Sequence, residues 1–319
     1  MRDETDKVSL ILKQFAATRD RSFPQRITIS PILMPMQMAV DSTAVILISE
    51  EGKSGFFLKL NDPDMMDEID PASSIAAARR AGETGIGPAL VHADENEDAL
   101  LFEVLGGYEP VRVSTASNPH LRKNILSRLR EWHNQDVSAS QVSPLTLASR
   151  RLAELGTLAS EGDVGGLPDD FAMIAAWITR ITSEMTARGH PSVPLHGENA
   201  LSNFLCNENG DVKMVDYERG LLGDPMYDVG GIAGEFGVEA HEIDDIVRLY
   251  DSACTRSMVA RAKLYLIIDD FLWGSWGRIQ HCRAPHRPEI EFFKFGGYRL
   301  ARCIHHLTHW PVDALLRSV

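Results

Sequence analysis

Residues 195–218 read LHGENALSNFLCNENGDVKMVDYE, and this stretch says most about how the chain folds. Asn209-Gly210 is a strong signal for a two-residue hairpin turn. It predicts that residues 203–206 and 212–215 pair as antiparallel strands. Residues just before the first strand must then lie near the residues that end the second strand.

Three oxygen-bearing side chains occupy those positions. Glu198 and Asn203 lie on the loop before the first strand, and Asp216 ends the second. Two carboxylates and an amide that converge in this way are the groups a phosphoryl-transfer site needs. One carboxylate orients the attacking hydroxyl, while the amide and the other carboxylate hold Mg²⁺ against nucleotide phosphates.

This stretch resembles the aminoglycoside phosphotransferase and choline kinase group, which are relatives of protein kinases. The signature of that group is H-x-D, four residues, N, a hairpin, and a metal-binding Asp followed by x-E. The matching positions are His196, Glu198, Asn203, Asp216 and Glu218. Residues 223–230, GDPMYDVG, match the D-P-x-x-D-x-G segment of the group, with Asp228 as its second Asp.

The resemblance implies a role for each residue. Glu198 would be the catalytic carboxylate, and His196 would brace the catalytic loop without exchanging protons. Asn203 and Asp216 would bind Mg²⁺ together with ATP. The group has Asp where this chain has Glu198, so the carboxylate lies one methylene further out. Because a misplacement of about 1 Å can lower a rate on the order of 10²-fold, we expect a reduced turnover.

A second match concerns the acceptor. Residues 273–280, WGSWGRIQ, resemble the W-G-x-W-x-x-x-Q stretch of choline and ethanolamine kinases, and residues 298–302, YRLAR, resemble the Y-A-x-x-R that follows it. Helical spacing puts both indoles on one face, where they can box a quaternary ammonium by cation–π attraction worth about 2 kcal/mol when desolvated. Glu235 matches an acidic residue of the group near the choline nitrogen. The expected acceptor site comprises Glu235, Asp269, Trp273, Trp276 and Tyr298. The alternative is that both tryptophans are ordinary core residues.

The N-terminal hundred residues have the pattern of strands. Two hairpins are predicted, one from residues 43–48 and 55–60, the other from 89–92 and 99–105, with a helix over 71–81 between them. Long helices follow, one of them starting at Asn118-Pro119. The expected fold class is α+β, a bilobal protein-kinase-like fold. Residues 1–103 would form a small antiparallel-sheet N-lobe, and residues 104–319 a larger, mainly helical C-lobe.

The nucleotide side of the predicted site lies in the N-lobe. Lys59 stands within the apolar run FFLKL and occupies the place of the lysine that contacts the α- and β-phosphates in the group. Residues 34–43 contain no glycine where relatives have them, so Ser42 and Thr43 would have to bind phosphate. Glu103, at the connector between the lobes, is assigned to the nucleotide as well. The helix glutamate expected to pair with the lysine falls near Ser74, with Glu68 the nearest acidic candidate.

Composition narrows the class of protein. The 45 acidic and 32 basic side chains of the 319 residues give a net charge of -13, which argues against nucleic-acid binding and is compatible with a cationic small molecule. The four cysteines form no C-x-x-C pair. No apolar run approaches the roughly 18 residues of a membrane span, and the N-terminus lacks a signal-peptide pattern. A cytoplasmic protein is expected, and no sequence signal specifies an oligomeric state. We expect His305, His306 and His309 to be ordinary helix residues, not zinc ligands.

These observations favour transfer of the ATP γ-phosphoryl group to the hydroxyl of a small amino alcohol such as choline or ethanolamine. One alternative keeps the chemistry but takes an aminoglycoside or another amino sugar as acceptor. The other alternative is a non-catalytic binding module, which Glu198 and the glycine-free segment favour.

Overall fold

The structure is a computed structural model that describes residues 4–15, 22–29, 32–34, 37–52, 54–62, 70–94, 99–137, 142–161, 167–287 and 290–319. Glu68 and residues 35–36 of the glycine-free segment lie outside these ranges.

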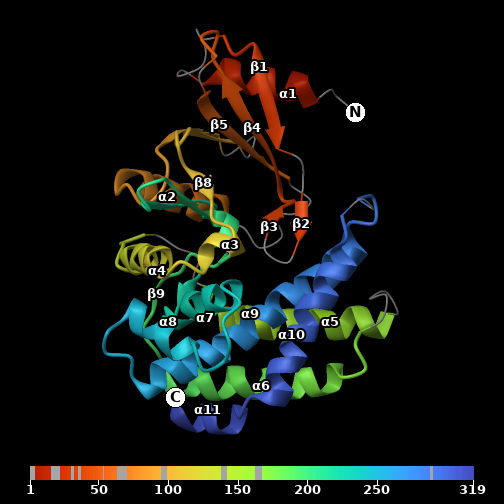
Figure 1. Cartoon of the computed structure of the whole chain (residues 1–319). Helices are drawn as coiled ribbons and strands as arrows, with labels where there is room; N and C mark the ends of the chain where they lie inside the picture. Colours follow the sequence, from red (N-terminus) through yellow and green to blue (C-terminus); the bar gives the residue numbers. More distant parts are fainter. Residues whose placement is uncertain are drawn as a thin grey trace.

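A five-stranded antiparallel sheet with the strand order β1-β4-β5-β7-β6 occupies the upper part of Figure 1. Its strands are β1 (Gln25–Ile29), β4 (Ser42–Ile48), β5 (Ser54–Asn61), β6 (Leu90–Asp94) and β7 (Ala99–Glu103). Helix α1 (Glu4–Gln14) packs on one face, where Ile11 and the neighbouring Phe15 belong to the same buried apolar cluster as Leu47 and Leu58. Because side chains alternate along a strand, the other face is left for the site.

Helices form most of the remaining chain, in the lower part of Figure 1. They are α3 (Val113–Ala116), α4 (Pro119–His133), α5 (Pro144–Glu161), α6 (Phe171–Arg188), α7 (Met226–Glu235), α8 (Ile243–Tyr250), α9 (Arg256–Arg283), α10 (Phe292–His309) and α11 (Val312–Ser318). The short strands β8 (Glu109–Pro110), β10 (Phe204–Cys206) and β11 (Val212–Met214) form one sheet. Two further pairs are β9 (Val193–Pro194) with β12 (Leu222–Gly223), and β2 (Ile32–Met34) with β3 (Gln37–Ala39).

Helix α9 runs through the centre of the helical part and is buried on every side from Leu264 to Gln280. It crosses α10 at very short range, because glycines meet there. A Cβ atom added at Gly277 would lie 2.8 Å from the Cα atom of Gly296, closer than side chains tolerate. The glycines of the WGSWG segment therefore allow the helix crossing that fixes the position of its tryptophans.

The predicted elements are largely observed. The β4–β5 and β10–β11 hairpins form as expected, and Asn118 caps α4 by accepting a hydrogen bond from the His120 amide at 2.9 Å. The helix predicted over 71–81 is α2 (Pro71–Glu83), capped by Asp70. Strand β7 ends at Glu103, two residues earlier than predicted, and Phe56↔Glu103 is its last pair with β5. The α+β class is confirmed, whereas a lobe boundary at residue 103 stays a prediction. Within the described part of the chain, no helix combines the length and the apolarity needed to cross a membrane.

Candidate active site

The loop before β10 is held in place by Asp228 of α7. Its fully buried carboxylate accepts hydrogen bonds from the backbone amides of His196 (2.7 Å) and Gly197 (3.1 Å) and from Asn199 Nδ2 (3.1 Å). Gly197 adopts a φ of 81°, and a Cβ atom there would lie 2.2 Å from the Arg219 carbonyl oxygen, so only glycine fits. The D-P-x-x-D-x-G segment thus acts as the scaffold of the loop.

His196 ties this loop to the second strand of the hairpin. It is fully buried, and its Nε2 donates a hydrogen bond to the Val215 carbonyl oxygen at 2.9 Å. Burial lowers the pKa of the ring, which favours the neutral form at physiological pH. This geometry fits the bracing role predicted for His196, which stays a prediction.

Glu198 follows on the same loop and is 2% exposed. Its Oε1 lies 3.8 Å from Arg219 Nε, and its Oε2 has no hydrogen-bond partner among the described residues. Burial raises the pKa of this carboxyl well above its usual value, and the charges of Asp216 and Asp41 act in the same direction. The group therefore binds a proton more readily than an ordinary glutamate.

Lys59 of β5 makes ion pairs with both Asp216 and Glu218. Burial alone would lower the pKa of the lysine, but these two carboxylates outweigh it and hold the pKa above its usual value. Asp216 has a φ of 74°, a left-handed conformation that Asp tolerates, and its pKa is lowered because Lys59 outweighs burial. Glu218 thus makes an ion pair of the kind expected of a helix glutamate, and α2 has Ser74 in the lining of the same cavity.

A cavity of about 460 Å³ lies between the sheet and the β10–β11 hairpin. It brings together most of the predicted nucleotide and metal residues, namely Ser42, Lys59, Glu103, Asn203 and Asp216. Thr43 is not among the lining residues, because Ser42, Ala44 and Ile46 of β4 face the cavity and the alternation of the strand turns Thr43 to the other side. Apolar side chains such as Phe57, Leu100 and Phe102 supply much of the remaining wall. This lining suits a flat base with its phosphates near the lysine.

The residues assigned to Mg²⁺ fit that ion. Asn203 Nδ2 donates to the Glu198 carbonyl oxygen at 3.2 Å, which fixes the amide and keeps its oxygen available to a cation. One carboxylate and one amide oxygen, completed by substrate phosphates and water, are a common donor set for Mg²⁺. Among the described residues, no group of three or more His, Cys, Asp or Glu side chains has a metal-binding arrangement.

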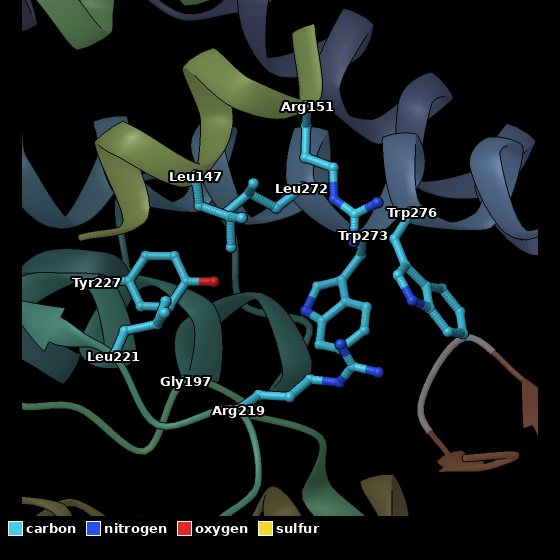
Figure 2. A pocket seen from close by; sticks show the side chains of 9 residues that line it. All are labelled: Leu147, Arg151, Gly197, Arg219, Leu221, Tyr227, Leu272, Trp273 and Trp276. Carbon is cyan, nitrogen blue, oxygen red and sulfur yellow. The ribbon is translucent and has the colours of Figure 1, made fainter. Parts of the chain in front are cut away.

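The two predicted box residues, Trp273 and Trp276, line a second, smaller cavity of about 40 Å³ next to Gly197 (Figure 2). Their ring centroids are 5.6 Å apart in an edge-to-face arrangement. The guanidinium carbon of Arg219 lies 5.6 Å from each centroid. The chain therefore places a cation of its own over both indoles.

The other predicted acceptor residues do not line this cavity. Glu235 and Asp269 are buried and pair with Arg299, at 3.0 and 3.5 Å respectively. Burial raises the pKa of Glu235 to about 7 and that of Asp269 to about 6. Tyr298 is 39% exposed on α10, where the Arg302 guanidinium lies over its ring. A contact of these three residues with a substrate stays a prediction.

Two arginines that the sequence analysis did not select belong to this cavity. Arg219 directly follows the D-Y-E triplet, so its place beside the motif was a usable signal. Arg151 reaches the cavity from α5, which no motif marks (Figure 2).

Comparison with known proteins identifies the family. A model described as "phosphotransferase enzyme family" matches residues 40–263. The chain belongs to this family. The matched range includes most residues that line the larger cavity, the loop with Glu198, and Asp228. Nothing among curated proteins matches the chain.

Solved structures share the fold of this phosphotransferase. A choline/ethanolamine kinase family protein from Mesorhizobium loti superposes with a TM-score of 0.80 at 18% identity, over 98% of both chains. The choline kinase LicA from Streptococcus pneumoniae gives 0.71 at 14% identity, over 95% of this chain and 100% of its own. The GDP complex of aminoglycoside 2'-phosphotransferase-IIIa gives 0.64 at 11% identity, over 95% and 98%. These likenesses confirm the predicted protein-kinase-like fold.

Proposed function

We propose that this protein transfers the terminal phosphoryl group of ATP, in the presence of Mg²⁺, to the hydroxyl group of a small molecule. The observation that carries the proposal is the arrangement of three side chains: Asn203 and Asp216 line the larger cavity, and Glu198 lies on the loop whose Gly197 lines the smaller one. One cavity holds Lys59 and has the size and lining for a nucleotide, and the other lies against the catalytic loop.

Each of these residues would have a distinct role. Lys59 would neutralise phosphate charge, and Asn203 and Asp216 would hold Mg²⁺, which when bound offsets the charge that develops on the transferred group. Glu198 would orient the acceptor hydroxyl and receive its proton. Because this transition state is loose, positioning and charge supply most of the catalysis, and a glutamate can serve in place of the aspartate.

For the acceptor, a small amino alcohol such as choline or ethanolamine is the proposal that the tryptophan pair supports. An amino sugar is the second candidate, because a shared fold extends to an aminoglycoside phosphotransferase. In either case the hydroxyl has to reach Glu198 from the side of Trp273 and Trp276.

The test is ADP release by the purified chain with Mg²⁺ and ATP. Choline, ethanolamine and kanamycin are offered separately, and Asp216→Asn serves as the metal-binding control. Release that depends on an acceptor and is lost in Asp216→Asn supports the proposal. No release with any acceptor, together with no ATP-dependent rise in Tm, would favour the non-catalytic alternative.

A further inference from the structure

The turn that leads into β4 is docked onto the helical part of the molecule. It consists of Val40 and Asp41 and follows the β2–β3 pair, which lies between the sheet and the helices in Figure 1. Val40 is 3% exposed and belongs to the same buried apolar cluster as Trp273 and Trp276. All other members of this cluster come from α9, α10 and the segment between them. The side chain of the turn is therefore buried with residues of the C-terminal helices.

Arg287 binds the backbone of the same turn. Its Nη1 donates hydrogen bonds to the Val40 carbonyl oxygen at 2.9 Å and to Asp62 Oδ2 at 3.0 Å. Asp62 directly follows β5, and its amide donates to the Asp41 carbonyl oxygen at 2.7 Å. One guanidinium therefore holds the start of β4 and the end of β5 together and ties both strands to the helical part.

The backbone that carries Arg287 is itself fixed. Arg287 lies in the segment between α9 and α10, where its amide donates to the Ala284 carbonyl oxygen at 3.1 Å. The Ile290 amide donates to the Arg287 carbonyl oxygen, also at 3.1 Å. Ala284 and Ile290 belong to the apolar cluster that includes Val40. The hydrogen bonds of Arg287 and the burial of Val40 thus hold the turn at the same place on the helices.

The docked turn leads directly into the larger cavity, beside Lys59. Asp41 and Ser42 line that cavity, and so does Lys59, whose strand β5 pairs with β4. Arg219 lies 3.6 Å from the Asp41 carboxylate and offsets a negative charge that would repel a phosphate. The contacts that fix the turn therefore also fix the wall of the cavity where phosphates are expected.

The composition of the segment explains why such contacts matter. Residues 34–43 contain no glycine, so the segment lacks the backbone freedom with which a glycine-rich loop approaches phosphate closely. Contacts with the helices order the turn without a nucleotide, and a site that is ordered beforehand loses less conformational freedom on binding. If the turn is released, only the fraction of molecules that keep it docked can bind, and the affinity falls by that fraction.

We propose that Arg287 is a positioning residue for the nucleotide. It holds the turn of Val40 and Asp41 against the helices, so that Ser42 and Lys59 meet the phosphates of ATP. Arg287 is not among the residues that line either cavity, so it acts through the turn and touches neither nucleotide nor acceptor. This inference rests on the proposed function and adds to it a residue outside the site.

The test is nucleotide binding, measured by titration calorimetry on the full chain with Mg²⁺. The probes are a non-hydrolysable ATP analogue and adenosine, which lacks phosphates. The variants are Arg287→Ala, Arg287→Lys and Val40→Ala, the last of which weakens the apolar attachment of the turn. Arg261→Ala is the matched control, because the Arg261 side chain is 16% exposed against 15% for Arg287 and pairs with Asp224 inside the helical part. Hydrogen exchange of residues 40–48 in the ligand-free chains reports release of the turn.

Arg287→Ala should weaken binding of the analogue about 10-fold, the effect expected if about a tenth of the molecules keep the turn docked. Adenosine binding should not change, and residues 40–48 should exchange faster. Val40→Ala should act in the same direction, whereas Arg287→Lys should retain part of the affinity and Arg261→Ala all of it.

Four results overturn the inference alone: an unchanged affinity for the analogue in Arg287→Ala, an equal loss for adenosine, the same loss in Arg261→Ala, or unchanged exchange of residues 40–48. A wild-type chain that does not bind the analogue overturns the proposed function together with the inference. Absence of ADP release despite binding of the analogue counts against the proposed function alone.

Discussion

Replacement of Asp228 by asparagine separates loop bracing from simple folding. The two carboxylate oxygens accept four hydrogen bonds, from the amides of His196 and Gly197, from Asn199 Nδ2, and from His133 Nε2 at 2.9 Å. An asparagine keeps the shape but turns one oxygen into an NH₂ group, which faces two of these donors whichever way it rotates.

The magnitude follows from that count. Two lost hydrogen bonds to a charged acceptor, at about 1.5–3 kcal/mol each, lower the free energy of unfolding by about 3–6 kcal/mol. A domain stable by roughly 5–15 kcal/mol retains a folded population. A displacement of Glu198 by about 1 Å should lower kcat on the order of 10²-fold in the molecules that stay folded.

The assay combines urea denaturation with ADP release, normalised to the folded fraction. Asp224→Asn is the matched control, because Asp224 is equally buried but accepts from the Met226 amide and from Arg261, away from the catalytic loop. It should lose stability and keep its kcat. Equal loss of kcat in both variants, or an unchanged kcat in Asp228→Asn, would refute the idea that Asp228 positions the loop.

Three further predictions concern single groups. Lys59→Met leaves Asp216 and Glu218 buried without their counterion, so it should lower stability by about 3–5 kcal/mol and raise KM for ATP; an unchanged urea midpoint would contradict the ion-pair geometry. If the longer side chain of Glu198 misplaces the carboxylate, Glu198→Asp should raise kcat by up to about 10²-fold. A kcat equal to or below that of the wild type would show that the carboxylate is not misplaced. Glu235 has a pKa of about 7, above its value in the unfolded chain, so its contribution to stability is present below about pH 4.5 and is lost as the pH rises through 7. Glu235→Gln should remove up to about 3 kcal/mol of this pH dependence, measured as the difference in the free energy of unfolding between pH 4.5 and 7.5 in urea titrations. The same difference in the wild type and the variant would argue against a raised pKa.

The sequence by itself determined the hairpins, the capped helices and the convergence of Glu198, Asn203 and Asp216. These features depend on local turn chemistry and on residues less than about twenty positions apart, where Asn209-Gly210 leaves the chain few alternatives. The pairing of Lys59 with that site was predictable because an unpartnered lysine in an apolar strand is too unfavourable to persist.

The tertiary structure decided the partners of these groups. Glu218, which no helix pattern selects, is a counterion of Lys59 beside Asp216. Arg219 lies over the two indoles that were expected to hold a substrate. Such contacts join segments more than fifty residues apart. Many distant side chains have the charge to pair with Lys59 or to lie over the indoles, so the packing of helices and sheet decides which of them does. Spacing along the chain can show that two tryptophans share a face, but only packing determines which cation lies against them.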